Sequence, residues 1–460
     1  MATLLVKNAK VVVTMDKQRR ELVDAGLFIR DGFIEKVGAV VDLPSSADKV
    51  LDLKDHIILP GLINTHHHFY QTLTRVVPAA QDANLFTWLK TLYPIWAKMT
   101  PEDIFISTQT ALTELALSGC TTASDHLYLY PNGSKLDDEI AAAREIGLRL
   151  HASRGSMSLG ESQGGLPPDS VVDTEEAILE DSIRLIDAFH DPNPGSKLQI
   201  VLAPCSPFSV TGNLMKESAV LAREKGVQLH THLAETEDET EFCLQKFGHK
   251  PVAYMQELNW VGEDVWFAHC VHLNNEEVNV FKREGCGVTH CPSSNMRLAS
   301  GIAPIWEYMQ AGVDVGLGVD GSASNDGSHL LAEARQAMLL GRVRAGLMGA
   351  SLSNENAPPI LTARNVLELA TIGGARVLGR NDIGSLEVGK AADFIAFDLN
   401  RLDYAGALHD PVSAVIFCHP QKVDYNVVHG ELIVEKGQMV TIDVPSQVKK
   451  HNQAAKRLLE

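Results

Sequence analysis

The sequence has few basic residues and no long apolar run. Lys and Arg number 40 against 58 Asp and Glu, so the formal net charge is −18. A generally acidic surface argues against nucleic-acid binding as the main task, because the phosphate backbone attracts positive surfaces. No segment is apolar for long enough to span a membrane, and the N-terminus lacks the basic-then-apolar order of a signal peptide. The sequence therefore predicts a cytoplasmic protein without nucleic-acid or membrane partners.

Cysteine is too sparse and too irregular to form a disulfide framework. The seven cysteines are scattered, odd in number and without a CxxC pair. Hydrophobic residues make up 45% of the chain, which is typical of a well-packed globular enzyme rather than of a disordered protein. The 460 residues suit two or three ordinary domains or one large barrel with an appendage.

What the sequence does contain is a regular alternation of apolar, strand-like runs with longer helix-like segments. Eight such runs are present, each followed by helical sequence. This order predicts the α/β class and a (β/α)8 TIM barrel, in which active residues lie at the C-terminal ends of the strands. The predicted strands end near His68, His126, Arg154, Pro204, Glu235, His269, Pro292 and Asp320.

Both ends of the chain have a different character. Residues 1 to about 60 have the pattern of short strands joined by turns, and Asp31–Gly32 is typical of a hairpin turn. Residues 384–397 and 427–437 show the same pattern. The two ends are therefore predicted to form β-structure outside the barrel.

Metal-type ligands follow several of the predicted strands. His66 and His68 come directly after an apolar run, and since a strand points alternate residues to one side, both imidazoles face the same way. His232 follows a later strand and Asp320 the last one. These groups can close on one divalent metal and leave a position open for water. His230 shares a side with His232 and could compete with it as a ligand.

The metal-type residues occur in a fixed order, namely His66-x-His68, His232-x-x-Glu235, His269 and Asp320. This pattern resembles the amidohydrolase superfamily, in particular its mononuclear branch, which deaminates purines, pyrimidines and triazines. The resemblance covers almost the whole chain. It implies that both chain ends fold together into one small β-sandwich, made of residues 1–60 and 375–445. It further implies a barrel over residues 61–374 and a C-terminal tail over residues 446–460.

The resemblance also implies a metal site and an assembly. It selects His232 rather than His230, because His232 lies three residues before Glu235. No lysine ends the fourth strand, so one metal per site is expected, either Zn²⁺ or, with the same donor types, Fe²⁺. We expect one Zn²⁺ per subunit of a homo-oligomer. The implied ligands are His66, His68, His232 and Asp320.

Further roles follow from the same resemblance. Glu235 is expected to carry a proton to the ring nitrogen beside the attacked carbon. His269 is expected to stabilise the tetrahedral centre or to orient the hydroxide, and Asp320 to accept the proton of the water. Gln71 and Arg154 are the candidates for polar contacts with the substrate.

These assignments predict an enzyme that acts on a small purine or triazine. The best candidate reaction is the zinc-dependent hydrolytic deamination of an oxo-purine, 8-oxoguanine, to urate and ammonia. A hydroxytriazine (hydroxydechloroatrazine) aminohydrolase and a guanine deaminase are alternatives of the same class. A barrel that binds a ring ligand without catalysis is an alternative of another class, and its metal content would separate it from the enzymes.

Overall fold

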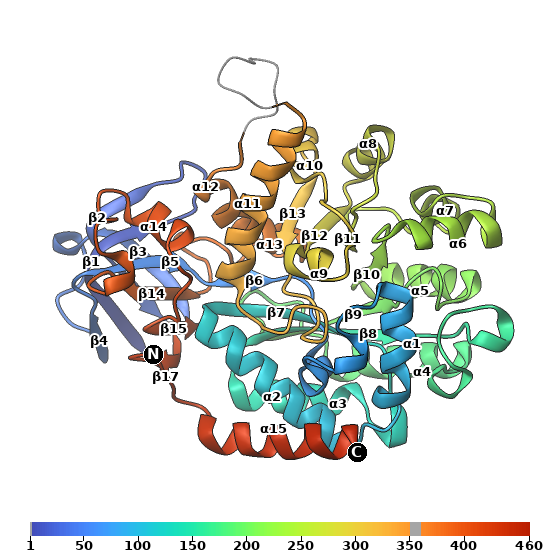
Figure 1. Cartoon of the computed structure of the whole chain (residues 1–460). Helices are drawn as coiled ribbons and strands as arrows, with labels where there is room; N and C mark the ends of the chain where they lie inside the picture. Colours follow the sequence, from blue (N-terminus) through green and yellow to red (C-terminus); the bar gives the residue numbers. More distant parts are fainter. Residues whose placement is uncertain (1, 350–359) are drawn as a thin grey trace.

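A closed barrel forms the centre of the protein (Figure 1). The computed structural model describes residues 2–349 and 360–460, and in this part of the chain eight parallel strands close in the order β10-β11-β12-β13-β6-β7-β8-β9. The predicted TIM barrel is therefore confirmed. The strands are β6 (Leu62–Asn64), β7 (Cys120–Leu127), β8 (Arg149–Ser156), β9 (Leu198–Pro204), β10 (Gln228–Leu233), β11 (Val265–His269), β12 (Gly287–His290) and β13 (Asp314–Leu317).

Helices surround the barrel and connect its strands (Figure 1). The second helix shows how the sequence sets their limits: Thr100 and Asp103 form a capping box, Pro101 takes the first position, and Gly119 ends the helix with φ 107°. The helices are α1 (Leu85–Trp96), α2 (Pro101–Ser118), α3 (Leu136–Ile146), α4 (Glu175–Phe189), α5 (Gly212–Lys225), α6 (Glu237–Phe247), α7 (Pro251–Glu257), α8 (Asn275–Glu284), α9 (Pro292–Arg297), α10 (Ile305–Ala311), α11 (Leu330–Leu347), α12 (Ala363–Glu368), α13 (Gly374–Val377) and α14 (Pro411–Phe417).

The two chain ends meet in one sheet beside the barrel (Figure 1). The predicted sandwich is a single hydrogen-bonded sheet of nine strands, in the order β17-β16-β15-β14-β5-β1-β2-β3 with β4 on β1. It stays continuous because β1 is long and pairs with β4 in its first part and with β5 in its second. The strands are β1 (Thr3–Val13), β2 (Glu21–Arg30), β3 (Phe33–Ala39), β4 (Lys49–Asp52), β5 (His56–Pro60), β14 (Phe394–Asp398), β15 (Tyr425–Val428), β16 (Glu431–Glu435) and β17 (Gln438–Met439).

Alternation along β5 joins this sheet to the barrel. Ile58 packs with Phe394 in the sheet's own core, whereas Ile57 and Leu59 belong to the large core that the sheet shares with the barrel. This is the period of two that a strand imposes on its side chains. β5 thus leads directly into β6, which is followed by His66, His67 and His68.

A buried ion pair also fastens the barrel to the sheet. Arg149, in β8, is fully buried and binds Asp393, just before β14, through Nε (2.7 Å) and Nη2 (3.0 Å). Its Nη1 donates to the carbonyl of Ser196 (2.7 Å). Asp393 also accepts a hydrogen bond, through Oδ1, from the backbone N–H of His429 (2.8 Å). The pair lies at the amino-terminal end of the barrel, where loops of TIM barrels contribute to stability rather than to chemistry.

The C-terminal segment is a helix rather than the tail that the sequence suggested. α15 (Val444–Leu459) packs on α2, where Gln447 donates from Nε2 to the carbonyl of Ile106 (2.8 Å). Ala454 and Leu458 join the large core. Within the described residues, no helix is both long and apolar enough to cross a membrane.

Candidate metal centre and active site

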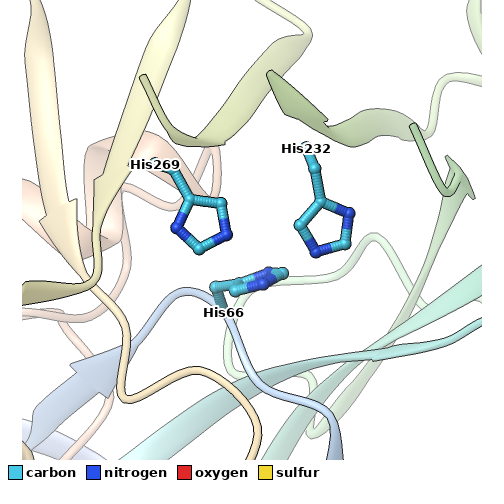
Figure 2. Close-up of side chains that lie close together, drawn as sticks. All are labelled: His66, His232 and His269. Carbon is cyan, nitrogen blue, oxygen red and sulfur yellow. The ribbon is translucent and has the colours of Figure 1, made fainter. Parts of the chain in front are cut away.

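Histidine and aspartate side chains from different strands converge at the carboxyl end of the barrel. The rings of His66, His232 and His269 point toward one another (Figure 2). Nε2 of His68 lies 3.1 Å from Nε2 of His232. Oδ1 of Asp320 lies 3.2 Å from Nε2 of His66 and 3.4 Å from Nε2 of His68. The four predicted ligands therefore share one small space.

Hydrogen bonds fix the protonation of two of these imidazoles. Nδ1 of His68 donates to the carbonyl of His126 (2.7 Å), and Nδ1 of His232 donates to the carbonyl of Cys205 (2.6 Å). Each neutral imidazole carries one proton, so Nε2 of both rings is bare. Two nitrogen lone pairs then face each other at 3.1 Å, an arrangement that is unfavourable unless a cation lies between or beside them.

A chain of two bonds fixes the third imidazole. Nδ1 of His230 donates to the carbonyl of Trp266 (3.0 Å), so its Nε2 accepts from Nδ1 of His66 (2.8 Å). Nε2 of His66 is therefore also bare, and it is buried without a hydrogen-bond partner. Three bare imidazole nitrogens and a carboxylate are the donor set that zinc prefers, so the residues present fit a divalent metal. His230, the competing candidate, lies behind His66 and orients it.

Glu235 and His269 lie beside this donor set. Nε2 of His269 is 3.5 Å from Oε2 of Glu235 and 3.8 Å from Oδ2 of Asp320. Burial raises the pKa of the Glu235 carboxyl, partly offset by His269. Burial alone would lower the pKa of His269, but the carboxylates of Glu235 and Asp320 outweigh it and raise that pKa. The pair can therefore hold and exchange a proton.

Three neighbours that the sequence analysis missed position these two side chains. Asn295 accepts from Nδ1 of His269 through Oδ1 (2.9 Å), and Ser300 donates to Oε1 of Glu235 (3.3 Å). The Glu239 carboxylate accepts from the backbone N–H of Ala234 (2.8 Å) and Glu235 (3.0 Å). Glu239 lies four residues after Glu235, which is a visible helical spacing, but Asn295 and Ser300 have no sequence signal that links them to the site.

The backbone is strained where it carries these groups. Ala234, His269, Cys270 and Asp320 have φ of 51°, 72°, 48° and 62°, in the left-handed region that non-glycine residues rarely adopt. All four lie at or just beyond the carboxyl end of a barrel strand: His269 ends β11, Ala234 and Cys270 follow β10 and β11 directly, and Asp320 lies three residues after β13. Strain of this kind persists only where the surrounding structure enforces it, and it gathers at functional sites.

A pocket opens onto the metal-type ligands. Gln71 is part of its wall, and its Oε1 is buried without a partner. The remaining wall is apolar or aromatic, apart from the site residues themselves and Ser324. The lining comprises His68, Gln71, Leu85, Trp88, Leu89, Tyr93, Tyr128, Cys205, Phe208, His232, Glu235, His269, Leu298, Asp320 and Ser324.

Arg154, the other predicted substrate contact, does not line this pocket. In the sheet it pairs with Leu127, one residue beyond His126, so it points to the opposite face from His126. Its Nε donates to Asp181 (2.9 Å), and its guanidinium lies 4.3 Å from the ring centre of Tyr130. The placement of Arg154 at the substrate is thus corrected: its side chain forms an ion pair between β8 and α4.

A (β/α)8 barrel with an open His and Asp donor set at the carboxyl ends of its strands defines a class of metal-dependent enzymes. The family model described as amidohydrolase family matches residues 57–433. The chain belongs to this family.

Individual relatives extend the comparison over the whole length. The 8-oxoguanine deaminase of Pseudomonas aeruginosa is 48% identical over 437 residues, which cover 94% of this chain and 95% of that protein. The hydroxydechloroatrazine ethylaminohydrolase of Pseudomonas sp. strain ADP is 36% identical, over 96% of this chain and 93% of that protein. Among solved structures, the atrazine chlorohydrolase of Arthrobacter aurescens complexed with zinc has a TM-score of 0.92 at 33% identity, over 98% of this chain and 100% of that one.

Proposed function

We propose that the protein is a zinc-dependent aminohydrolase that converts 8-oxoguanine and water to urate and ammonia. The observation that carries the proposal is the convergence of three bare imidazole nitrogens with Asp320 beside a buried Glu235. The choice of an oxo-purine is supported by the 48% identity to a relative that is an 8-oxoguanine deaminase.

The metal would be held by His66, His68, His232 and Asp320, as one Zn²⁺ per subunit, and Fe²⁺ suits the same donors. A divalent ion of this kind lowers the pKa of a water molecule to about 7 and so supplies a nucleophile at neutral pH. The hydrogen bonds from His68, His232 and His66 to carbonyl oxygens or to His230 keep the ligating nitrogens free of protons.

Glu235 is the proposed proton shuttle. Its carboxyl is buried within reach of His269, and burial raises its pKa, so it can accept a proton from the water and return it to the ring nitrogen. His269 is held by Asn295 with Nε2 facing the site, where it can stabilise the negative charge that develops on the oxygen bound to the ring carbon. Asp320 is the proposed acceptor of the second proton of the water, which it passes to the leaving amine. The oxygen of the water remains on the ring carbon as the C–N bond breaks, and the amine leaves as ammonia.

The pocket suits a flat ring. Trp88, Leu89, Phe208 and Leu298 provide apolar surface, while the Gln71 amide can pair with a polar edge of the ring. The similarity to the hydroxydechloroatrazine ethylaminohydrolase supports a hydroxytriazine as the second candidate substrate. A guanine deaminase is a further alternative, and a silent ring-binding barrel would have no use for the Glu235 and His269 pair.

Ammonia release from a panel of rings tests the proposal. Zinc-loaded protein should give kcat/KM values that fall in the order 8-oxoguanine, guanine, hydroxytriazine, because a site that pairs with the extra oxo group and N–H of the oxo-purine rejects rings without them. Chelator-treated protein is the control and should be inactive. Faster turnover of the hydroxytriazine would replace the purine assignment, and metal binding without any ammonia release would favour the non-catalytic barrel.

A further inference from the structure

One wall of the pocket carries a polar group that has no role in the chemistry above. Tyr93, in α1, lines the pocket together with Tyr128 and Cys205. The Tyr93 hydroxyl is fully buried and has no hydrogen-bond partner. Buried hydroxyls are nearly always paired in folded proteins, so an unpaired one that faces a ligand pocket suggests that the ligand supplies its partner.

Tyr93 is held in place by its surroundings. Its ring packs edge-to-face on Trp96, with 5.9 Å between ring centres. The helix that carries it is capped by Asn84, which accepts from the backbone N–H of Thr87 (3.1 Å). Trp88 Nε1 donates to the carbonyl of Ala323 (3.2 Å), which ties the helix to the loop that follows Asp320. These contacts hold the Tyr93 hydroxyl at a fixed position in the pocket wall.

The wall around Tyr93 is neutral. Burial raises the pKa of the Tyr93 hydroxyl well above its usual value, so the hydroxyl keeps its proton. Among the described residues that line the pocket there is no lysine or arginine. A neutral donor in such a wall fits a carbonyl oxygen of an uncharged ring better than it fits an anion.

The position of Tyr93 indicates which part of a ring it can meet. The carbon that loses its amine must lie at Glu235, His269 and Asp320. Tyr93 has no hydrogen bond or ring contact with these three residues in the described part of the chain. Its hydroxyl is carried by α1 rather than by the strand ends that hold these three groups, so it can meet an edge of the ring other than the reacting carbon.

We propose that the Tyr93 hydroxyl donates a hydrogen bond to the oxo oxygen on the five-membered ring of the oxo-purine and so sets the preference for 8-oxoguanine over guanine. This inference rests on the proposed function, and it assigns Tyr93 as a specificity residue that neither the motifs nor the comparisons indicate. Guanine lacks that oxygen and leaves the hydroxyl unpaired, which is the situation in which a polar site discriminates most strongly.

The experiment compares Tyr93→Phe with the wild-type protein on both purines. The substitution removes only the hydroxyl, and kcat/KM for 8-oxoguanine should fall about 10- to 100-fold, whereas kcat/KM for guanine should change by less than about threefold. Most of the loss should appear in KM, because the contact lies away from the reacting carbon. Zinc content and Tm should stay at the wild-type values.

Tyr404→Phe is the matched control. Tyr404 is also buried with an unpartnered hydroxyl, but it does not line the pocket. This variant should keep the wild-type ratio of kcat/KM for the two purines. An equal loss on both purines in Tyr93→Phe would mark Tyr93 as structural and overturn the inference while leaving the proposed function intact. A wild-type protein without activity on 8-oxoguanine would overturn both.

Discussion

The ion pair at the amino-terminal end of the barrel and the ligand site at its carboxyl-terminal end differ in how completely their buried polar groups are paired. At the amino-terminal end, the guanidinium of Arg149 uses all three of its nitrogens, and both oxygens of Asp393 accept a hydrogen bond. At the carboxyl-terminal end, His66 Nε2, Gln71 Oε1 and the Tyr93 hydroxyl are equally buried and have no partner. Since leaving a buried polar group unpaired lowers stability, the first arrangement serves the fold and the second serves ligands that the fold itself does not supply.

The largest effect is expected when the metal ligands His66 and His68 are removed. In His66→Ala combined with His68→Ala, we expect the purified protein to lose nearly all of its zinc or iron. Turnover should fall by at least about 10⁴-fold, because the metal chemistry accounts for most of the acceleration. Metal analysis and ammonia release measure the two effects. Full metal retention in the double variant would place the metal elsewhere.

The opposite end should respond in stability rather than in chemistry. In Arg149→Met, Asp393 is left as a buried, unpaired carboxylate, and the free energy of unfolding should fall by about 3–5 kcal/mol. Arg184→Met is the matched control, because its partners Asp137 and Asp181 are both partly exposed and such pairs contribute at most about 1 kcal/mol each. Thermal or urea unfolding measures both. Equal stabilities of the two variants would remove the distinction between the barrel ends.

Glu235→Gln separates proton transfer from metal binding. The amide keeps the shape of the carboxyl but cannot carry a proton, so we expect retained metal and a turnover at least about 10²-fold lower. Because burial raises the pKa of Glu235, the rate of the wild-type protein should fall as the pH drops through that raised value and the carboxylate is protonated. This acidic limb should disappear from the pH profile of Glu235→Gln. Near-wild-type turnover would remove Glu235 from the mechanism.

Sequence reasoning reached the barrel because its signal is local. Each apolar run ends where a strand ends, and the ligands stand at those ends, so strand order and candidate ligands follow from the chain alone. The last helix, α15, was not predicted because two of its four buried positions are the polar residues Gln447 and His451. They interrupt the repeat of apolar residues, every three to four positions, that indicates a helix in the sequence. The partners of His269 and Glu235 were missed because they come from a separate segment, residues 295–300, that only the closed barrel brings to them.

Arg154 illustrates a different limit. Whether a strand residue faces the barrel interior or the helices depends on its pairing register, and a shift of one residue reverses the answer. The sequence places Arg154 correctly at a strand end, but only the pairing with Leu127 shows that it faces the helix layer.

Arg154→Met has the smallest expected effect. It tests a charged residue that lies near the ligand site at the carboxyl end of the barrel but is paired, as Arg149 is at the opposite end. Because Arg154 is paired with Asp181 and stacked on Tyr130, it should behave like the paired groups of the opposite end. We expect a loss of about 1 kcal/mol in the free energy of unfolding, since Asp181 is partly exposed, and a kcat/KM for 8-oxoguanine within about threefold of the wild type. Asp181→Asn should lose more stability than Arg154→Met, because Asp181 also binds Arg184 (2.8 Å). Suppose instead that kcat/KM for 8-oxoguanine falls more than about tenfold in Arg154→Met but not in Asp181→Asn, with the metal content unchanged. Arg154 would then be a substrate contact after all, because loss of the ion pair alone would affect both variants.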